Sequence, residues 1–208
     1  MSVIRWLFLL LVVWSAPAAS SSPVILVLGD SLSSAHGIGE QQGWVSLLQD
    51  RLDENGHPHQ VVNASVSGDT TRDALSRLDA VIARHQPDIA IVELGGNDGL
   101  RAFSIDSIEE NLSRIIRMLR EAGARVVLAA MRMPPNYGPV YTRAFENLYP
   151  ALADRFDAAL VPFFMDGVAT DRALMQDDDI HPNAAAQPIL LENVWRVLQP
   201  LLEQPGAG

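Results

Sequence analysis

Short, almost wholly apolar runs alternate along the chain with longer stretches in which apolar residues recur every three or four positions. The runs are typical of strands buried on both faces of a parallel sheet, and the longer stretches are typical of helices that cover it. The predicted strands lie at 24–28, 61–64, 88–94, 125–131 and 159–164. The predicted helices lie at 44–52, 70–83, 108–123, 139–157 and 182–202. This order predicts a single three-layer α/β/α domain with a five-stranded parallel sheet.

The N-terminal segment follows a different pattern. Arg5 precedes an uninterrupted apolar run at 6–14, and Ala16-Pro17-Ala18 puts small residues at both positions that a signal peptidase recognises. We therefore predict a signal peptide at 1–18, a single domain at 19–208, and a periplasmic or secreted protein with no stable membrane anchor after cleavage. An uncleaved N-terminal anchor is the alternative, although the apolar run is short for a membrane span.

Composition excludes several classes of function. The chain has 208 residues, 48% of them apolar and 19% charged, which suits the core of one globular domain. Its formal net charge of −10 opposes broad binding to nucleic acid or anionic lipid, because both are negatively charged. The absence of cysteine excludes disulfides, thiolate metal sites and a thiol nucleophile. We expect a monomer that acts on a small molecule.

Polar residues that suit chemistry follow four of the predicted strands. Ser31 lies just after the first strand, Gly68 in the loop after the second, and Asn97 in the loop after the third. Asp178 and His181 lie beyond the fifth strand and one intervening turn. Because the carboxyl ends of parallel strands meet at one edge of a sheet, we expect these residues to converge in a single site.

These residue types supply what acyl transfer requires: a nucleophile, a base, an acid that orients the base, and donors for the oxyanion. Ser31 is the candidate nucleophile and His181 the candidate base. The backbone N–H of Gly68 and the side-chain amide of Asn97 are candidate oxyanion donors, since glycine allows close backbone approach. For Ser31, the simpler alternative is that it only caps the next helix.

Three consecutive aspartates precede His181. Residues three apart lie on one side of a turn, which favours Asp178 as the acid that orients the imidazole. Asp179 would face His181 only from an extended loop, and Asp177 would face it only across a complete helical turn. Pro182 disfavours helical geometry at His181, so Asp177 is the weaker candidate.

The motifs Gly29-Asp30-Ser31-Leu32, Gly68, Gly95-Gly96-Asn97-Asp98 and Asp178-x-x-His181, in this order, resemble those of the SGNH (GDSL) hydrolase family. The longer runs around them are similar to its bacterial exported thioesterase I, lysophospholipase and arylesterase branch. The resemblance implies a flavodoxin-like fold, no metal or cofactor, and hydrolysis of esters and thioesters through an acyl-serine. It also implies a catalytic triad of Ser31, Asp178 and His181. The oxyanion donors that it implies are Ser31 N–H, Gly68 and Asn97.

Two segments differ from the pattern common in that family. Ser33 to Gly37 replaces small residues followed by an aromatic residue, so we expect the mouth of the site to differ. His36 lies in this segment, and without an evident partner we interpret it as an incidental loop residue. Asp179 stands where relatives often have glycine. Aspartate tolerates a left-handed backbone, but here it adds a negative charge beside His181.

Other residues receive simpler interpretations. Leu100, Phe103 and Met133 are candidates for lining an acyl pocket, although apolar loop residues are as often part of the core. Glu93 is an acid inside a buried strand and therefore needs a polar partner. The histidines away from the site are expected on the solvated surface: His57, His59 and His85.

The leading interpretation is a serine hydrolase of small esters, acyl thioesters or lysophospholipids. A carbohydrate acetylesterase with the same site is the alternative, and acyl-chain preference would separate the two. A metallohydrolase is a third interpretation, because polar residues at strand ends also bind divalent metals: Asp30, Asp69, Asn97, Asp98 and His181. A single histidine in the predicted site disfavours it. The complete set of catalytic residue types disfavours a non-catalytic binding protein that keeps the fold.

Overall fold

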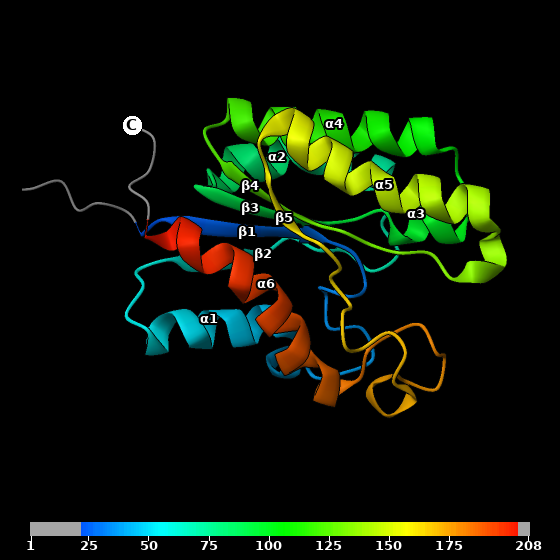
Figure 1. Ribbon diagram of the computed structural model, residues 1–208. Helices are drawn as coiled ribbons and strands as arrows, with labels where there is room; N and C mark the ends of the chain where they lie inside the picture. The colour runs from blue at the N-terminus through cyan, green and yellow to red at the C-terminus, as the bar shows by residue number, and fades with distance from the viewer. Residues whose placement is uncertain (1–21, 204–208) are drawn as a thin grey trace, which may run out of the picture.

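The five predicted strands form one parallel sheet (Figure 1). The computed structural model describes residues 22–203, so the predicted signal peptide at 1–18 lies outside the described residues. The strands are β1 (Val24–Gly29), β2 (Gln60–Asn63), β3 (Ile89–Glu93), β4 (Arg125–Ala129) and β5 (Ala159–Val161). Their order across the sheet, β2-β1-β3-β4-β5, is flavodoxin-like, and it changes direction between β1 and β3. Ligands bind at such switch points in open α/β sheets.

The central strands β1 and β3 are buried on both faces. Every residue of β3 is buried, and so is every residue of β1 after Val24, which explains their continuous apolar sequences. Their register pairs Gly29 with Glu93, so both strands end at the same level of the sheet. Ser31 and Asn97, which follow these ends in sequence, are thereby brought to one edge.

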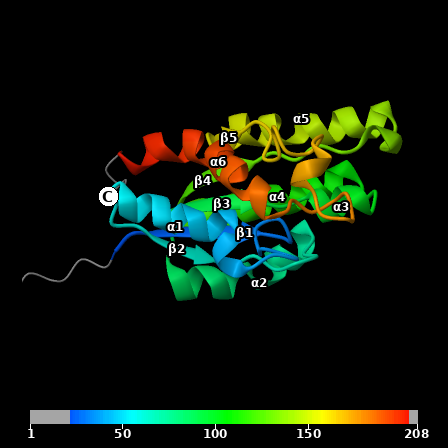
Figure 2. The ribbon, with the colours of Figure 1, turned by 90° about the horizontal axis from the view of Figure 1, so that it is seen from below.

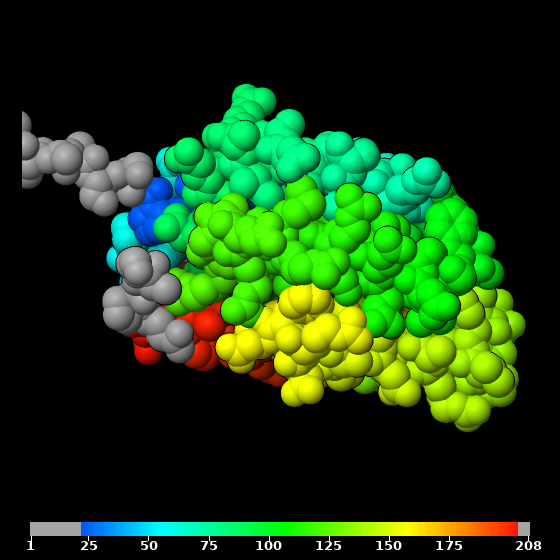
Figure 3. Space-filling model, turned by 90° about the horizontal axis from the view of Figure 1, so that it is seen from above, coloured from blue at the N-terminus to red at the C-terminus, as the bar shows by residue number. Residues whose placement is uncertain are grey.

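Helices cover both faces of the sheet. On one face lie α1 (Trp44–Glu54) and α6 (Gln187–Leu202), which are seen in front of the sheet in Figure 2. On the other face α2 (Thr71–His85), α4 (Ile105–Glu121) and α5 (Pro139–Phe156) lie side by side, as Figure 3 shows. Their buried residues recur at helical spacing, as predicted. No helix within residues 22–203 is both long enough and apolar enough to cross a membrane.

Several elements differ from the predicted ones, and three of these differences have a local cause in the sequence. A short helix, α3 (Gly96–Leu100), follows β3 directly, and its glycine-rich sequence has too little helical propensity to predict it. The last helix begins at Gln187, because a separate 3-10 turn occupies Ala184–Ala186. Strand β5 ends at Val161, earlier than predicted, because Pro162 has no N–H with which to continue the ladder.

Side-chain caps fix the loops around the site. Thr70 begins α2, and its side chain accepts a hydrogen bond from the backbone N–H of Asp73 in the first turn. The carboxylate of Asp98, in α3, accepts the Thr71 N–H at 2.9 Å and the Thr71 hydroxyl at 2.6 Å. The neighbouring Asp69 forms an ion pair with Arg77 at 2.7 Å. These contacts hold the loop after β2 against the start of α3.

Candidate active site

A tight turn after β1 presents Ser31 at the carboxyl edge of the sheet. The Asp30 carboxylate accepts the Leu32 N–H at 3.1 Å, which closes the turn locally. A β-carbon at Gly29 would lie 2.9 Å from Glu93 Oε2, closer than real contacts of this kind. The turn therefore needs glycine at the end of β1.

A loop between β5 and α6 brings Asp178 and His181 to Ser31. Asp178 Oδ1 accepts the backbone N–H groups of Ile180 and His181, each at 2.9 Å, which folds the loop into a compact turn. Asp178 Oδ2 lies 2.6 Å from His181 Nδ1, and His181 Nε2 lies 2.9 Å from Ser31 Oγ. The three side chains form a continuous hydrogen-bonded series.

The geometry separates Asp178 from its neighbours. Its hydrogen bonds with the His181 ring and with the N–H groups of His181 and Ile180 hold the pKa of Asp178 well below its usual value, because each favours the charged form. Asp179 has a left-handed backbone, with φ of 56°, as its sequence position suggested. Its carboxylate forms an ion pair with Arg172 at 3.2 Å, and the carboxylate that contacts the imidazole of His181 is that of Asp178.

The three candidate oxyanion donors differ in how they are engaged. Among residues 22–203, neither the Ser31 N–H nor the Gly68 N–H donates a hydrogen bond to a protein group. The Asn97 amide, by contrast, donates to Asp30 Oδ2 at 2.9 Å and to the Asp69 carbonyl at 3.0 Å. Since this amide has two hydrogens, both are in use, and an oxyanion would have to share one of them.

Two buried carboxyl groups lie beneath the nucleophile turn. Asp30 is 2% exposed and Glu93 is fully buried. Burial raises the pKa of Asp30 to about 6. Burial and the neighbouring Asp30 charge raise the pKa of Glu93 well above its usual value. Glu93 Oε2 accepts the Ser33 hydroxyl at 2.6 Å, which is the partner its burial requires, while its Oε1 has none within residues 22–203.

A cavity of about 580 Å³ opens beside Ser31 and His181. Its lining is mainly apolar and includes four methionines, a side chain that adapts to ligands of different shape. The predicted pocket residues Leu100 and Met133 belong to this lining. Phe103 does not line the cavity; its carbonyl accepts the Tyr141 hydroxyl at 2.8 Å. The main apolar lining residues are Leu100, Met131, Met133, Pro134, Pro135, Phe163, Met165, Met175 and Ile180.

His36, which we interpreted from the sequence as an incidental residue at the mouth of the site, lies against His181, and Gln176, in the loop that carries His181, joins the two segments. The ring centroids of His36 and His181 are 4.5 Å apart. Gln176 donates from one amide nitrogen to the His36 carbonyl at 2.8 Å and to the Pro182 carbonyl at 3.0 Å. Neither contact has a sequence signal, because both depend on loops that are far apart along the chain.

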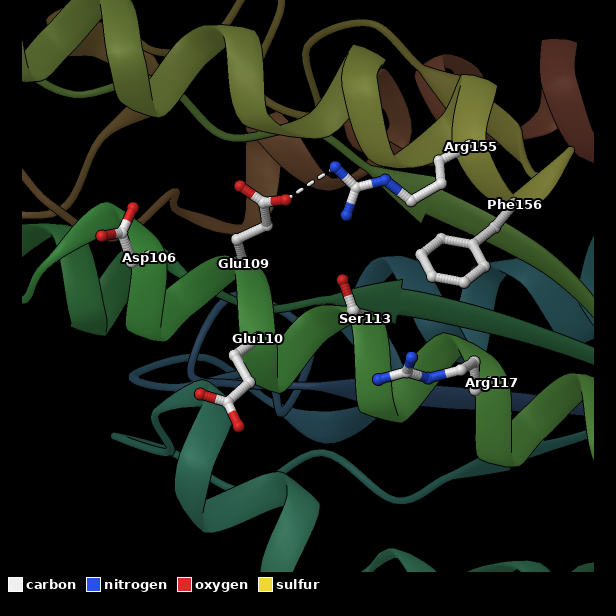
Figure 4. Close-up of a pocket in the computed structure, with 7 residues that line it drawn as sticks. All are labelled: Asp106, Glu109, Glu110, Ser113, Arg117, Arg155 and Phe156. Carbon is white, nitrogen blue, oxygen red and sulfur yellow. Dashed lines mark ion pairs between the residues drawn. The ribbon is translucent and has the colours of Figure 1, made fainter.

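A second hollow lies between α4 and α5, with a volume of about 400 Å³ (Figure 4). An ion pair of 2.7 Å between Glu109 and Arg155 crosses it, as the dashed line in Figure 4 marks. Ser113 lies in its lining, but no histidine does. The hollow therefore lacks the base that would activate this serine.

The remaining polar candidates have other roles. Within residues 22–203, no group of three or more histidine, aspartate or glutamate side chains is placed to hold a metal ion. Asp30, Asp69 and Asp98 are each held by separate protein contacts. The expected solvation of His59 is wrong: it is only 8% exposed, its ring lies 6.1 Å from that of His57, and burial lowers its pKa.

Known proteins resemble the chain over most of its length. Esterase TesA of Pseudomonas aeruginosa is 49% identical over 183 residues, which are 88% of this chain and 91% of that protein. Thioesterase 1/protease 1/lysophospholipase L1 of Escherichia coli K12 is 43% identical over 205 residues, which are 97% of this chain and 96% of that one. The crystal structure of the psychrotrophic esterase EstA from Pseudoalteromonas, inhibited by monoethylphosphonate, is 38% identical and superposes with a TM-score of 0.83, covering 87% of this chain and 99% of EstA.

The family comparison agrees with the geometry. The GDSL-like Lipase/Acylhydrolase family matches residues 27–188, a span that begins in β1, just before Ser31, and ends beyond His181. All strands of the sheet after the first residues of β1 fall within it. The motifs, the sheet order and these similarities together show that the chain belongs to the GDSL-like lipase/acylhydrolase family.

Proposed function

We propose that the protein hydrolyses carboxylic esters and acyl thioesters through an acyl-serine intermediate, with Ser31, His181 and Asp178 as its catalytic triad. The observation that carries this proposal is the hydrogen-bonded series from Asp178 through His181 to Ser31, with contacts of 2.6 and 2.9 Å. Such a series makes a serine hydroxyl nucleophilic, because the imidazole accepts the hydroxyl proton as a general base.

In the proposed reaction, Ser31 Oγ attacks the acyl carbonyl while His181 Nε2 takes the hydroxyl proton. Asp178 holds the imidazole in the required orientation and stabilises its protonated form. His181 then gives the proton to the departing alcohol or thiol, which leaves the acyl group on Ser31. Water, activated by the same imidazole, attacks this ester and releases the acid.

The negative charge that develops on the carbonyl oxygen needs donors that are already in place. The N–H groups of Ser31 and Gly68 suit this role because neither is engaged with the protein within residues 22–203. The Asn97 amide is the third proposed donor. Its hydrogen bonds to Asp30 and Asp69 hold it at a fixed position beside Ser31.

The apolar cavity supports acyl groups longer than acetyl. Its volume of about 580 Å³ is larger than an acetyl group would fill, and its methionine-rich lining suits an apolar acyl chain. Both features favour this proposal over a carbohydrate acetylesterase. The names of the relatives, an esterase and a thioesterase with lysophospholipase activity, support the same substrate class.

We also propose that residues 1–18 direct export and are removed, which N-terminal sequencing of the protein from its host would test.

The central test is Ser31→Ala, with Ser113→Ala as the control because Ser113 lies in a hollow without a histidine. We expect Ser31→Ala to fold normally and to lose hydrolysis of p-nitrophenyl esters and acyl-CoA. A serine-directed phosphonate should label the wild type and the control, but not Ser31→Ala. Turnover that persists in Ser31→Ala, with labelling of another residue, would refute the proposed nucleophile.

A further inference from the structure

The loop after Ser31 is bent so that His36 reaches the catalytic imidazole. Two residues beside His36 have left-handed backbones: Ala35, with φ of 57°, and Gly37, with φ of 75°. Alanine rarely adopts this conformation, because its β-carbon crowds the backbone. Residues in such conformations persist where the surrounding contacts hold them, and these cluster at functional sites.

The contacts that hold this bend come from the histidine loop itself. Gln176 donates one amide hydrogen to the His36 carbonyl and the other to the Pro182 carbonyl, at 2.8 and 3.0 Å. The backbone N–H of Gln176 also donates to the His181 carbonyl at 2.7 Å. A β-carbon at Gly37 would collide with the Gln176 amide, so the two loops fit closely here. One side chain thus ties the segment of His36 to the segment of His181.

The result is a contact between two imidazoles. Their centroids are 4.5 Å apart and their planes meet at 43°, so His36 covers one side of the His181 ring. The two nitrogens of this ring form hydrogen bonds with Asp178, at Nδ1, and with Ser31, at Nε2. The side chain of His181 is only 18% exposed, although its loop is otherwise open to solvent.

The two imidazoles of His36 and His181 differ in their charged neighbours. Asp178 contacts His181 directly, and the buried Asp30 lies in the turn that carries Ser31. Asp179, which lines the same cavity, is partly neutralised by Arg172. Within residues 22–203, His36 is the aromatic side chain that lies against the His181 ring, and positive charges on two rings this close would repel each other.

We propose that His36 is a positioning residue for His181: its ring keeps the imidazole turned toward Ser31, and its charge, when present, limits protonation of the imidazole. This inference rests on the proposed function, since it assigns His36 a role in that same triad. It predicts that the effect of the ring and the effect of its charge can be separated. A phenyl ring at position 36 would still lie against His181, but it cannot carry a charge.

The experiment compares His36→Ala and His36→Phe with the wild type, with His85→Phe as a control distant from the site and Ser31→Ala as the reference for lost chemistry. We expect His36→Ala to lower kcat by about 5- to 20-fold with KM changed less than about twofold, because a misplaced base affects the chemical step. His36→Phe should keep kcat within about twofold of wild type. Its acid limb of kcat/KM should move to higher pH by a few tenths of a unit or more, because the opposing charge is gone.

A second measurement does not depend on activity. The C–H resonances of the His181 ring, followed by NMR against pH, should show protonation at higher pH in His36→Phe than in wild type, and no change in His85→Phe. The inference is overturned if His36→Ala keeps the wild-type kcat, if His36→Phe loses as much as His36→Ala, or if the His181 titration is the same in all variants. Retained turnover in Ser31→Ala would instead refute the proposed function. The NMR titration of His181 would then still test its contact with His36.

Discussion

Carboxyl groups lie on two sides of Ser31, and their surroundings shift their pKa values in opposite directions. On the sheet side, Asp30 and Glu93 are buried, and burial raises the pKa of both. On the loop side, the Asp178 side chain is 42% exposed, and hydrogen bonds from the histidine turn lower its pKa. The same functional group is thus driven toward its neutral form in one region and its charged form in the other.

The difference shows how each region supports the site. The sheet side is held by long-range contacts, such as that between Asp30 and Asn97, which are 67 positions apart. On the loop side, the carboxylate of Asp178 is held by contacts within three positions, with the backbone of Ile180 and His181. We therefore expect loop substitutions to change catalysis with little loss of stability, and sheet substitutions to change both.

The largest expected effect is on the loop side. Asp178→Asn should lower kcat by about 10⁴, as for the equivalent change in an unrelated triad, because the amide no longer stabilises the protonated imidazole. The melting temperature should change little. Asp177→Asn is the matched control and should be nearly silent. Normal activity in Asp178→Asn, together with collapse in Asp177→Asn or Asp179→Asn, would show that the acid has been misassigned.

The next effect is on the sheet side. Asn97→Ala should lower kcat by roughly 10²–10³ with little change in KM, since an oxyanion donor acts mainly on the transition state. It also leaves the buried carboxylate of Asp30 without one of its donors, so some loss of stability should accompany it. Steady-state kinetics and thermal unfolding of the same sample test both parts. A rise in KM alone would make Asn97 a substrate-binding residue instead.

A third prediction concerns stability against pH. Because the pKa of Glu93 is raised in the folded state, the native protein holds a proton that the unfolded chain releases above about 4.5, and stability falls as pH rises past that value. Asp30 contributes with the same sign between 3.8 and about 6. Glu93→Gln removes the Glu93 contribution, so its Tm relative to wild type should rise between pH 4 and pH 7.

For a chain of this size, roughly 2–4 °C in Tm corresponds to 1 kcal/mol, and we expect the relative gain to reach at least about this range. Glu110→Gln is the control, because Glu110 is exposed. A relative Tm of Glu93→Gln that stays constant across these pH values would mean that Glu93 is ionised in the native protein.

The smallest effect is again on the loop side. Asp179→Asn removes a negative charge beside His181 while keeping a residue that tolerates the left-handed backbone. The imidazole should then be harder to protonate, and the acid limb of kcat/KM should shift to lower pH by a few tenths of a unit. The exposed pair with Arg172 contributes little, about 0–1 kcal/mol, so Tm should hardly change. A shift to higher pH would contradict this assignment.

The sequence predicted the sheet and its helices, because each depends on a pattern within a short window. It predicted the meeting of Ser31, Asp178 and His181 because the carboxyl ends of parallel strands share one edge of a sheet, and because the motifs resemble those of a known family. It did not predict α3, whose glycine-rich sequence is stabilised by contacts such as that of Asp98 with Thr71. Nor did it predict the ring contact of His36, which depends on how two distant loops pack. Long-range packing between loops leaves no periodic trace in sequence.

The span of the triad also bears on how activity returns during refolding. The contact between Asp178 and His181 closes a loop of only three positions, whereas the contact between His181 and Ser31 joins residues 150 positions apart. Closing short loops costs less entropy, so the acid and base pair early and at low cost, while the nucleophile is acquired through the longest closure in the site. Recovery of hydrolysis would therefore report the joining of the chain's two ends into one domain, and fluorescence of the buried Trp44, in α1, would report the packing of its core.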